Sequence, residues 1–215
     1  DLQSGAAPWC VTQDITIRKN KFINLGQGFN ILGRDNLNTS EVTKRVLIEN
    51  NLVDVTMTSS TPQGRIIAVT GGPQFLQFKH NTLFTVGASG TFGNSENSPV
   101  ASHFICQDNI VTNGLYGFIG TATGDGSATL NAWYFDYTFT KNAIIGGTTG
   151  NYTTGALGNF FPANLAAVGF TDTSGSFATN NYTLTVGSAY HNAASDGTDV
   201  GCDIAALNTA IAGVV

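Results

Sequence analysis

A repeat centred on asparagine is the feature that most limits what this 215-residue chain can fold into. The pattern h-x-h-x-x-N-x-h, in which h is an apolar residue, occurs five times and begins with residues 15–22. Its asparagines are separated by 31, 30, 28 and 33 residues. They are Asn20, Asn51, Asn81, Asn109 and Asn142. A period in this range is typical of repeat proteins, in which each unit stacks on its neighbours.

The spacing of the apolar positions is that of β-strands. Alternate residues of a strand face the same side, so h-x-h places two apolar side chains inward. Aligned repeats give three inward columns that contain only apolar or aromatic residues. The columns are Ile15, Val46, Leu76, Phe104 and Tyr137; Ile17, Ile48, Phe78, Cys106 and Phe139; and Phe22, Val53, Leu83, Val111 and Ile144. Because β-branched and aromatic residues dominate, the repeat predicts an all-β solenoid and disfavours leucine-rich or helical repeats.

The asparagine itself stands where the alternation breaks. Asparagine tolerates left-handed backbone conformations, which suits a bend between two strands. Parallel strands of successive coils lie about 4.8 Å apart. The sequence therefore predicts that the five asparagine side chains form one internal ladder of hydrogen-bonded amides.

The chain length favours one elongated domain, residues 1–215. We expect regular coils over 1–145, irregular coils and side loops over 146–190, and a C-terminal cap over 191–215. The Gly-rich segments 87–100 and 120–131 are expected to be loops, and Trp9 to plug the open core at the N-terminal end. Asp203 is a good N-cap for a short helix whose apolar face is Ile204, Leu207 and Ile211, and that helix is expected to cover the last coil.

The composition indicates a protein with few charges. Charged residues make up 11% of the chain, the net charge is −5, and there are 26 glycines. These values favour an extracellular or cell-surface location. The nine lysines and arginines are scattered, so a nucleic acid partner is not expected. The sequence contains no apolar run of 18 residues, so we expect no membrane span.

Several stretches resemble the bacterial right-handed parallel β-helix repeat proteins, which have the pectate-lyase-like superfold. The matching stretches are residues 8–9, 28–35, 71–74, 79–82, 116–120, 159–162, 190–193 and 196–203. The resemblance implies a right-handed β-helix of about five to six coils. It also implies that the chain corresponds to the C-terminal portion of a longer family member.

Outward positions of the aligned repeats supply candidate catalytic residues. Two places before the asparagines, Arg18, Glu49 and Lys79 form a ladder of alternating charge, typical of a solvated edge. One place before them, His80 and Asp108 fall on adjacent coils, and a histidine oriented by a carboxylate can act as a base. Two exposed polar neighbours are the alternative, because neither a nucleophile nor a second acid shares the patch.

A second candidate group comes from the loops. Arg34, Asp35 and Arg65, together with Lys44 and Arg45, are expected to converge on one side of the solenoid.

Lyases of this superfold hold calcium with acidic residues on adjacent coils, and calcium needs six to eight oxygen ligands. Here the aligned acids Glu49, Asp54 and Asp108 occupy three different columns, and residues 196–203 lack the spacing of an EF-hand loop. We therefore expect capped turns rather than a metal site over 196–203, and no cofactor, with calcium as the alternative. Trp133 and Tyr134 are candidates for stacking on a sugar or a partner, because alternation with inward Phe135 and Tyr137 would leave Tyr134 exposed.

The three cysteines are an odd number. Cys106 falls in an inward column and is expected to be buried. Cys10 and Cys202 lie near opposite ends of a rod roughly 25 Å long, beyond disulfide reach unless the tail folds back. They are either free or paired between molecules.

Two functional hypotheses follow. The first is an extracellular structural protein that associates with copies of itself end to end, into filaments in the extended case. The second is a carbohydrate-active β-helix, a polysaccharide lyase or binding module, which rests on analogy of fold alone. We favour the first and do not assign an enzymatic activity, because columns of catalytic acids are missing from the repeats.

Overall fold

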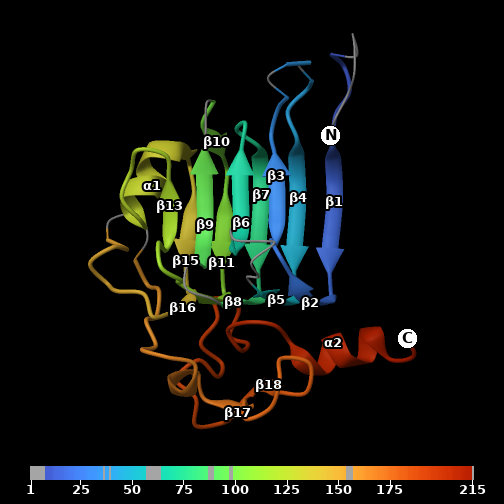
Figure 1. Cartoon of the computed structure of the whole chain (residues 1–215), viewed down its shortest axis with the longest axis vertical. Coiled ribbons are helices and arrows are strands. Elements are labelled where there is room, and N and C mark those ends of the chain that lie inside the picture. Colours follow the sequence, from blue (N-terminus) through green and yellow to red (C-terminus); the bar gives the residue numbers. More distant parts are fainter. Residues whose placement is uncertain are drawn as a thin grey trace.

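The computed structural model describes residues 8–35, 37–38, 40–56, 64–86, 90–96, 99–153 and 157–214. The described residues form a parallel β-solenoid of about 4 turns with two short α-helices and a 3-10 helix, Ala166–Val168. Figure 1 shows the strands stacked side by side, from β1 at the N-terminal end to β13, β15 and β16 at the other. The predicted all-β solenoid is confirmed.

Each turn contributes strands to three parallel sheets. The first sheet contains β1 (Gln13–Arg18), β4 (Lys44–Glu49), β7 (Gln74–Lys79), β10 (Ala101–Ser102), β11 (Ile105–Gln107), β14 (Tyr134–Phe135) and β15 (Thr138–Thr140). The second contains β2 (Lys21–Leu25), β5 (Leu52–Thr56), β8 (Thr82–Val86), β12 (Ile110–Thr112) and β16 (Ala143–Ile145). The third contains β3 (Phe29–Leu32), β6 (Arg65–Thr70), β9 (Thr91–Glu96) and β13 (Phe118–Gly120). Outside the solenoid lie the antiparallel pair β17 (Phe170–Asp172) and β18 (Asn181–Leu184), and the helices α1 (Ser127–Trp133) and α2 (Ile204–Ile211).

The strand register confirms the predicted inward columns. In the first sheet, Ile17 pairs with Ile48, Ile48 with Phe78, Phe78 with Cys106, and Cys106 with Phe139. Ile48, Phe78 and Cys106 are completely buried. Phe78 also makes edge-to-face contacts with Phe29 and Phe104, at ring-centroid distances of 5.8 and 6.4 Å. Apolar residues at every position of a column thus produce a continuous core along the solenoid.

The predicted asparagine ladder is present and is the main polar element of the core. Asn109 is typical: its Nδ2 donates to the Oδ1 of Asn142 at 2.9 Å, and its Oδ1 accepts from the Nδ2 of Asn81 at 3.0 Å. The same Nδ2 also donates to the backbone oxygens of Phe78 and Gln107. Each amide therefore satisfies backbone carbonyls at a corner that would otherwise bury them unpaired.

The ladder has a further member that the repeat did not predict. Asn142 donates through Nδ2 to the Oδ1 of Asn159 at 3.0 Å, and Asn159 donates to the backbone oxygen of Phe139. Asn159 follows Asn142 by only 17 residues. It falls outside the 28–33-residue period, so alignment of the repeats missed it.

The bend lies one residue earlier than predicted. Left-handed backbone occurs at the residue before each asparagine of the repeat, with φ between 48° and 60°. These residues are Lys19, Asn50, His80, Asp108 and Lys141. The expectation that asparagine itself adopts this conformation was wrong, because the asparagine side chain must point inward to join the ladder.

A second left-handed column precedes the first inward residue of each repeat, with φ between 53° and 59°. It consists of Asp14, Arg45, Phe75, His103 and Asp136. Neighbours in this column contact one another: Arg45 Nε lies 2.5 Å from Asp14 Oδ1, and the rings of Phe75 and His103 stack at 4.4 Å. Each coil therefore has one left-handed residue within the first sheet and a second one at the end of that sheet, before the asparagine.

Residues 164–214, here called the C-terminal tail, cover the outer face of the second sheet. Phe84 and Ile110 of the sheet pack with Leu184, Val200 and Leu207 of the tail in one buried cluster. In Figure 1 the tail runs beneath β16, β8, β5 and β2, and α2 points toward the β1 end. Asp203 caps α2, with Oδ1 accepting from the N–H of Ala206 at 2.9 Å, as predicted. The helix does not cover the last coil, however, because its apolar face packs on the apolar outer face of the second sheet.

Two segments expected to be loops contain regular structure. Residues 91–96 form β9, and Gly93 of this strand allows the ring of Phe118 to fill the core, since a Cβ there would lie 2.2 Å from that ring. Residues 127–133 form α1, whose Leu130 is fully buried. The prediction from Gly and Ser content was wrong here because Gly93 and Gly120 leave room for the rings of Phe118 and Trp133.

The two ends of the solenoid differ in exposure. At the N-terminal end, Ile15 and Ile23 are 38% and 41% exposed, and Trp9, expected to plug the core, is itself 73% exposed. At the other end, Phe139 and Ile144 are at most 1% exposed. The N-terminal coil is therefore open among the described residues, whereas the C-terminal end is closed.

Candidate functional site

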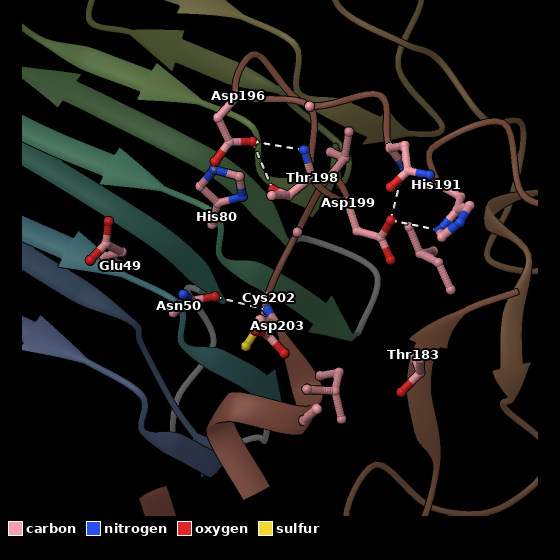
Figure 2. A pocket seen from close by; sticks show the side chains of 17 residues that line it. Glu49, Asn50, His80, Thr183, His191, Asp196, Thr198, Asp199, Cys202 and Asp203 are labelled. Atoms are coloured by element: carbon pink, nitrogen blue, oxygen red, sulfur yellow. Dashed lines mark hydrogen bonds and ion pairs between the residues drawn. The ribbon is translucent and has the colours of Figure 1, made fainter. Parts of the chain in front are cut away.

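A groove of about 580 Å³ lies where the C-terminal tail crosses the corners of the solenoid. Figure 2 shows that it is lined mainly by polar side chains, from the ends of β4 and β7 on one side and from the tail on the other. The lining residues that carry charge or can be protonated are Glu49, His80, His191, Asp196, Asp199, Cys202 and Asp203.

Three consecutive backbone N–H groups of the tail donate to three successive coils. The N–H of Gly201 donates to the backbone oxygen of Asp108, that of Cys202 to Oγ1 of Thr82, and that of Asp203 to Oδ1 of Asn50. The tail therefore runs opposite to the stacking direction and joins three coils.

His80 lies close to two carboxylates at one side of this groove. Its Nε2 is 3.6 Å from Oδ2 of Asp108 and 3.4 Å from Oδ2 of Asp196. The sequence predicted that His80 and Asp108 are neighbours on adjacent coils. The structure places a second carboxylate, that of Asp196 in the tail, beside His80. Both distances exceed the usual hydrogen-bond length, so the contacts are electrostatic rather than those of a base held in a fixed orientation.

Asp108 is buried, and its side chain accepts hydrogen bonds from the tail. Its Oδ1 accepts from the N–H of Ser195 at 2.7 Å, and its Oδ2 accepts from the hydroxyl of Ser195 at 2.5 Å. Only 2% of Asp108 is exposed. The carboxylate therefore holds the tail on the solenoid, and the exposed polar pair considered as an alternative is not observed.

Residues 196–203 form capped turns, as the sequence suggested. Oδ1 of Asp196 accepts from the N–H and the hydroxyl of Thr198, at 3.0 and 2.7 Å. The hydroxyl bond and then the N–H bond lower the pKa of the Asp196 carboxyl below its usual value. Oδ1 of Asp199 accepts from the N–H of Asn192 and lies 2.7 Å from Nδ1 of His191. Within the described ranges, no three His, Cys, Asp or Glu residues are placed to hold a metal ion.

We predict that Asp108→Asn loosens the tail, because an amide cannot accept both hydrogen bonds from Ser195 and no longer attracts His80. The expected loss is about 1–3 kcal/mol of unfolding free energy. Hydrogen exchange of the amides near Ser195 should accelerate before the rest of the protein is affected.

Asp136→Asn is the matched control for this change. Asp136 is also a left-handed corner residue beside a histidine, with His103 Nδ1 at 2.8 Å, but its side chain is 65% exposed. We expect a change below about 0.5 kcal/mol there. Equal effects at the two positions would contradict the assigned role of Asp108.

Arg65 does not join Arg34 and Asp35, contrary to what was expected of these loop residues. Arg65 begins β6, whereas Arg34 and Asp35 follow the end of the parallel neighbour β3. They therefore lie at opposite ends of the third sheet. Oδ1 of Asp35 accepts from the N–H groups of Asn38 and Leu37, which lower its pKa, and Arg45 pairs with Asp14.

The aromatic candidates face the wrong way for stacking on a ligand. Tyr134 is 3% exposed, and its hydroxyl contacts Oγ of Ser95. Trp133 ends α1 and is half-buried. The outward residue is Phe135, at 70% exposure, because the helix before β14 and the left-handed Asp136 after it shift the alternation by one. The prediction of an exposed Tyr134 was wrong.

The cysteines form no disulfide with one another. Cys106 is buried in the core, as expected, and Cys202 is buried between the tail and the second sheet, whereas Cys10 is half-buried. Burial, and after it the negative charge of Asp203, raises the pKa of the Cys202 thiol to about 12. Cys202 is thus poorly placed for a bond to another molecule.

We expect iodoacetamide to leave Cys106 and Cys202 unmodified in the folded protein at pH 8, because the thiolate is the reactive form and both thiols are buried. Denaturant should make both reactive. Mass spectrometry of alkylated peptides checks this, and rapid labelling of Cys202 without denaturant would contradict it.

Searches of family models, curated proteins and solved structures found no match to this chain. What the structure supports from the resemblance is the parallel β-solenoid fold. In the described part of the chain, no helix has the length and apolar character required to cross a membrane.

Proposed function

We propose that the chain is an extracellular structural module of the right-handed, pectate-lyase-like type that associates with copies of itself through its N-terminal coil. The observation that carries this proposal is the exposed end of the core. Ile15 is 38% exposed there, whereas its register partner in the next coil, Val46, is 4% exposed.

The edge of β1 supports the same proposal. Among the described strands, β1 pairs with β4 alone, so in this part of the chain its other edge presents backbone N–H and C=O groups that can receive another strand. A shallow hollow of about 560 Å³ at this edge is lined by Thr16, Ile17, Arg18 and Asn20. No described residue donates to the Oδ1 of Asn20, which is the acceptor end of the ladder.

Fewer observations support the alternative function, a carbohydrate-active β-helix. Tyr134 is buried, and Arg34 and Arg65 lie at opposite ends of the third sheet. The groove beside His80 is occupied by contacts that hold the tail.

Sedimentation equilibrium over a dilution series tests self-association. We expect a mass above that of one chain that falls on dilution. Ile15→Lys should shift the equilibrium toward monomer, because it places a charge in the exposed apolar end. Val186→Lys, at an 89% exposed position of the tail, is the control and should leave the equilibrium unchanged. A monomer at all concentrations would refute the proposal.

A further inference from the structure

We infer that two copies join through their N-terminal coils about a two-fold axis, with β1 of one copy antiparallel to β1 of the other. This inference rests on the proposed self-association and specifies its geometry. It predicts a closed dimer rather than a filament.

The closed C-terminal end disfavours head-to-tail stacking. Tyr152 stacks on Phe139 at a ring-centroid distance of 5.6 Å, and Phe161 packs on Tyr152 at 5.6 Å. Tyr152 is only 3% exposed. The N–H of Gly146 donates to the oxygen of Pro162, and Pro162 has no N–H with which to pair a further strand. Figure 1 shows α1 at this end, away from β1.

A filament needs two different ends that fit each other, whereas a two-fold contact uses the same surface twice. Of the two ends described, the N-terminal one has the exposed core and the free strand edge. The surface that can bury apolar area on association is therefore the same in both copies.

The sequence of β1 is complementary to itself when reversed. With Thr16 opposite Thr16 of the second copy, Ile15 falls opposite Ile17, and Asp14 falls opposite Arg18. Directly opposite residues of antiparallel strands share a face. The isoleucine pairs then extend the two cores into each other, while opposite charges meet on the outer face, twice by symmetry.

Other registers of the β1–β1 pair match apolar and charged residues less well than the one centred on Thr16. A shift by one residue sets isoleucine against Thr16 and turns an apolar side chain outward. The arrangement centred on Thr16 is the one that places Arg18 beside the carboxylate of Asp14. That carboxylate already binds Arg45 at 2.5 Å in its own chain, so the contact becomes a three-residue network.

Disulfide trapping tests the symmetry directly. Opposite Cβ atoms on antiparallel strands lie about 4.5–5.5 Å apart, so Thr16→Cys should form a reducible dimer under mild oxidation in a Cys10→Ser background. Thr138→Cys is the control, because Thr138 lies in the same outward column at the far end of the first sheet. It should remain monomeric on a non-reducing gel.

Charge reversal gives a second, independent test. Arg18→Glu places like charges opposite Asp14 of the second copy and should weaken association about tenfold or more. Lys79→Glu is the matched control: Arg18 and Lys79 both pair with Glu49 in the register, but Lys79 lies inside the stack. It should change the dissociation constant less than twofold. Melting curves of both variants show whether they remain folded.

The outcomes separate this inference from the proposed function. A dimer with Thr16→Cys trapping supports both. If the assembly mass keeps rising with concentration and Thr16→Cys forms no disulfide-linked dimer, self-association is supported and the two-fold geometry is refuted. A wild-type monomer at every concentration overturns both.

Discussion

Asn109→Ala is expected to destabilise the protein by about 3–4 kcal/mol. The substitution removes the donor to Asn142, Phe78 and Gln107 and the acceptor for the N–H and Nδ2 of Asn81. Asn109 is fully buried, so water cannot replace these partners. Each buried group left unpaired costs about 1–3 kcal/mol.

Asn20→Ala is the control within the same ladder. Asn20 is only partly buried, and it donates to Asn51 and Arg18 without a described donor to its own Oδ1. We expect a loss of about 1 kcal/mol. Chemical denaturation measures both values, and equal losses would contradict a ladder whose strength depends on burial.

Phe78→Ala should cost about 3–5 kcal/mol, the second large effect we expect. Phe78 is fully buried in the middle of its column, between Ile48 and Cys106, and it contacts the rings of Phe29 and Phe104. Neighbouring coils are fixed by strand hydrogen bonds, so they cannot collapse into the cavity. The loss therefore includes both transfer and cavity contributions.

Phe135→Ala provides the comparison, because the same side chain is removed from a position that is 70% exposed. Its expected effect is below about 0.5 kcal/mol. Urea midpoints with unchanged slopes give both values. A Phe78→Ala loss as small as that of Phe135→Ala would show that the column is not the core of the fold.

The sequence predicted those parts of the fold that repeat. Columns such as Ile17, Ile48 and Phe78 recur at a fixed place before an asparagine, and the stacking of strands converts that spacing directly into contact. Asp203 as a cap for α2 was also predicted, because an N-cap is a local feature.

Parts that depend on long-range packing were not predicted. Asn159 extends the ladder, but no full repeat precedes it. The outer face of the second sheet gives no separate signal, since Phe84 and Ile110 fit an exposed strand as well as one covered by the tail. Residues 191–215 were therefore predicted to be an end cap.

The part of the candidate site that lies within the repeat was predicted, whereas the part that the tail contributes was not. His80 and Asp108 are neighbours through the repeat, and alignment was sufficient to bring them together. Ser195 and Asp196 reach them from 87 or more residues away, through a turn that lies outside the repeat. The partner that determines what Asp108 does therefore came only from the structure.

If copies of the chain associate through the exposed N-terminal coil, this coil becomes protected on association. Hydrogen exchange at two protein concentrations tests this most directly. We predict that peptides covering Gln13–Arg18 become protected as concentration rises, while peptides covering α1 and β16 exchange at an unchanged rate. Protection of β1 that is independent of concentration, or concentration-dependent protection confined to other segments, would contradict the account.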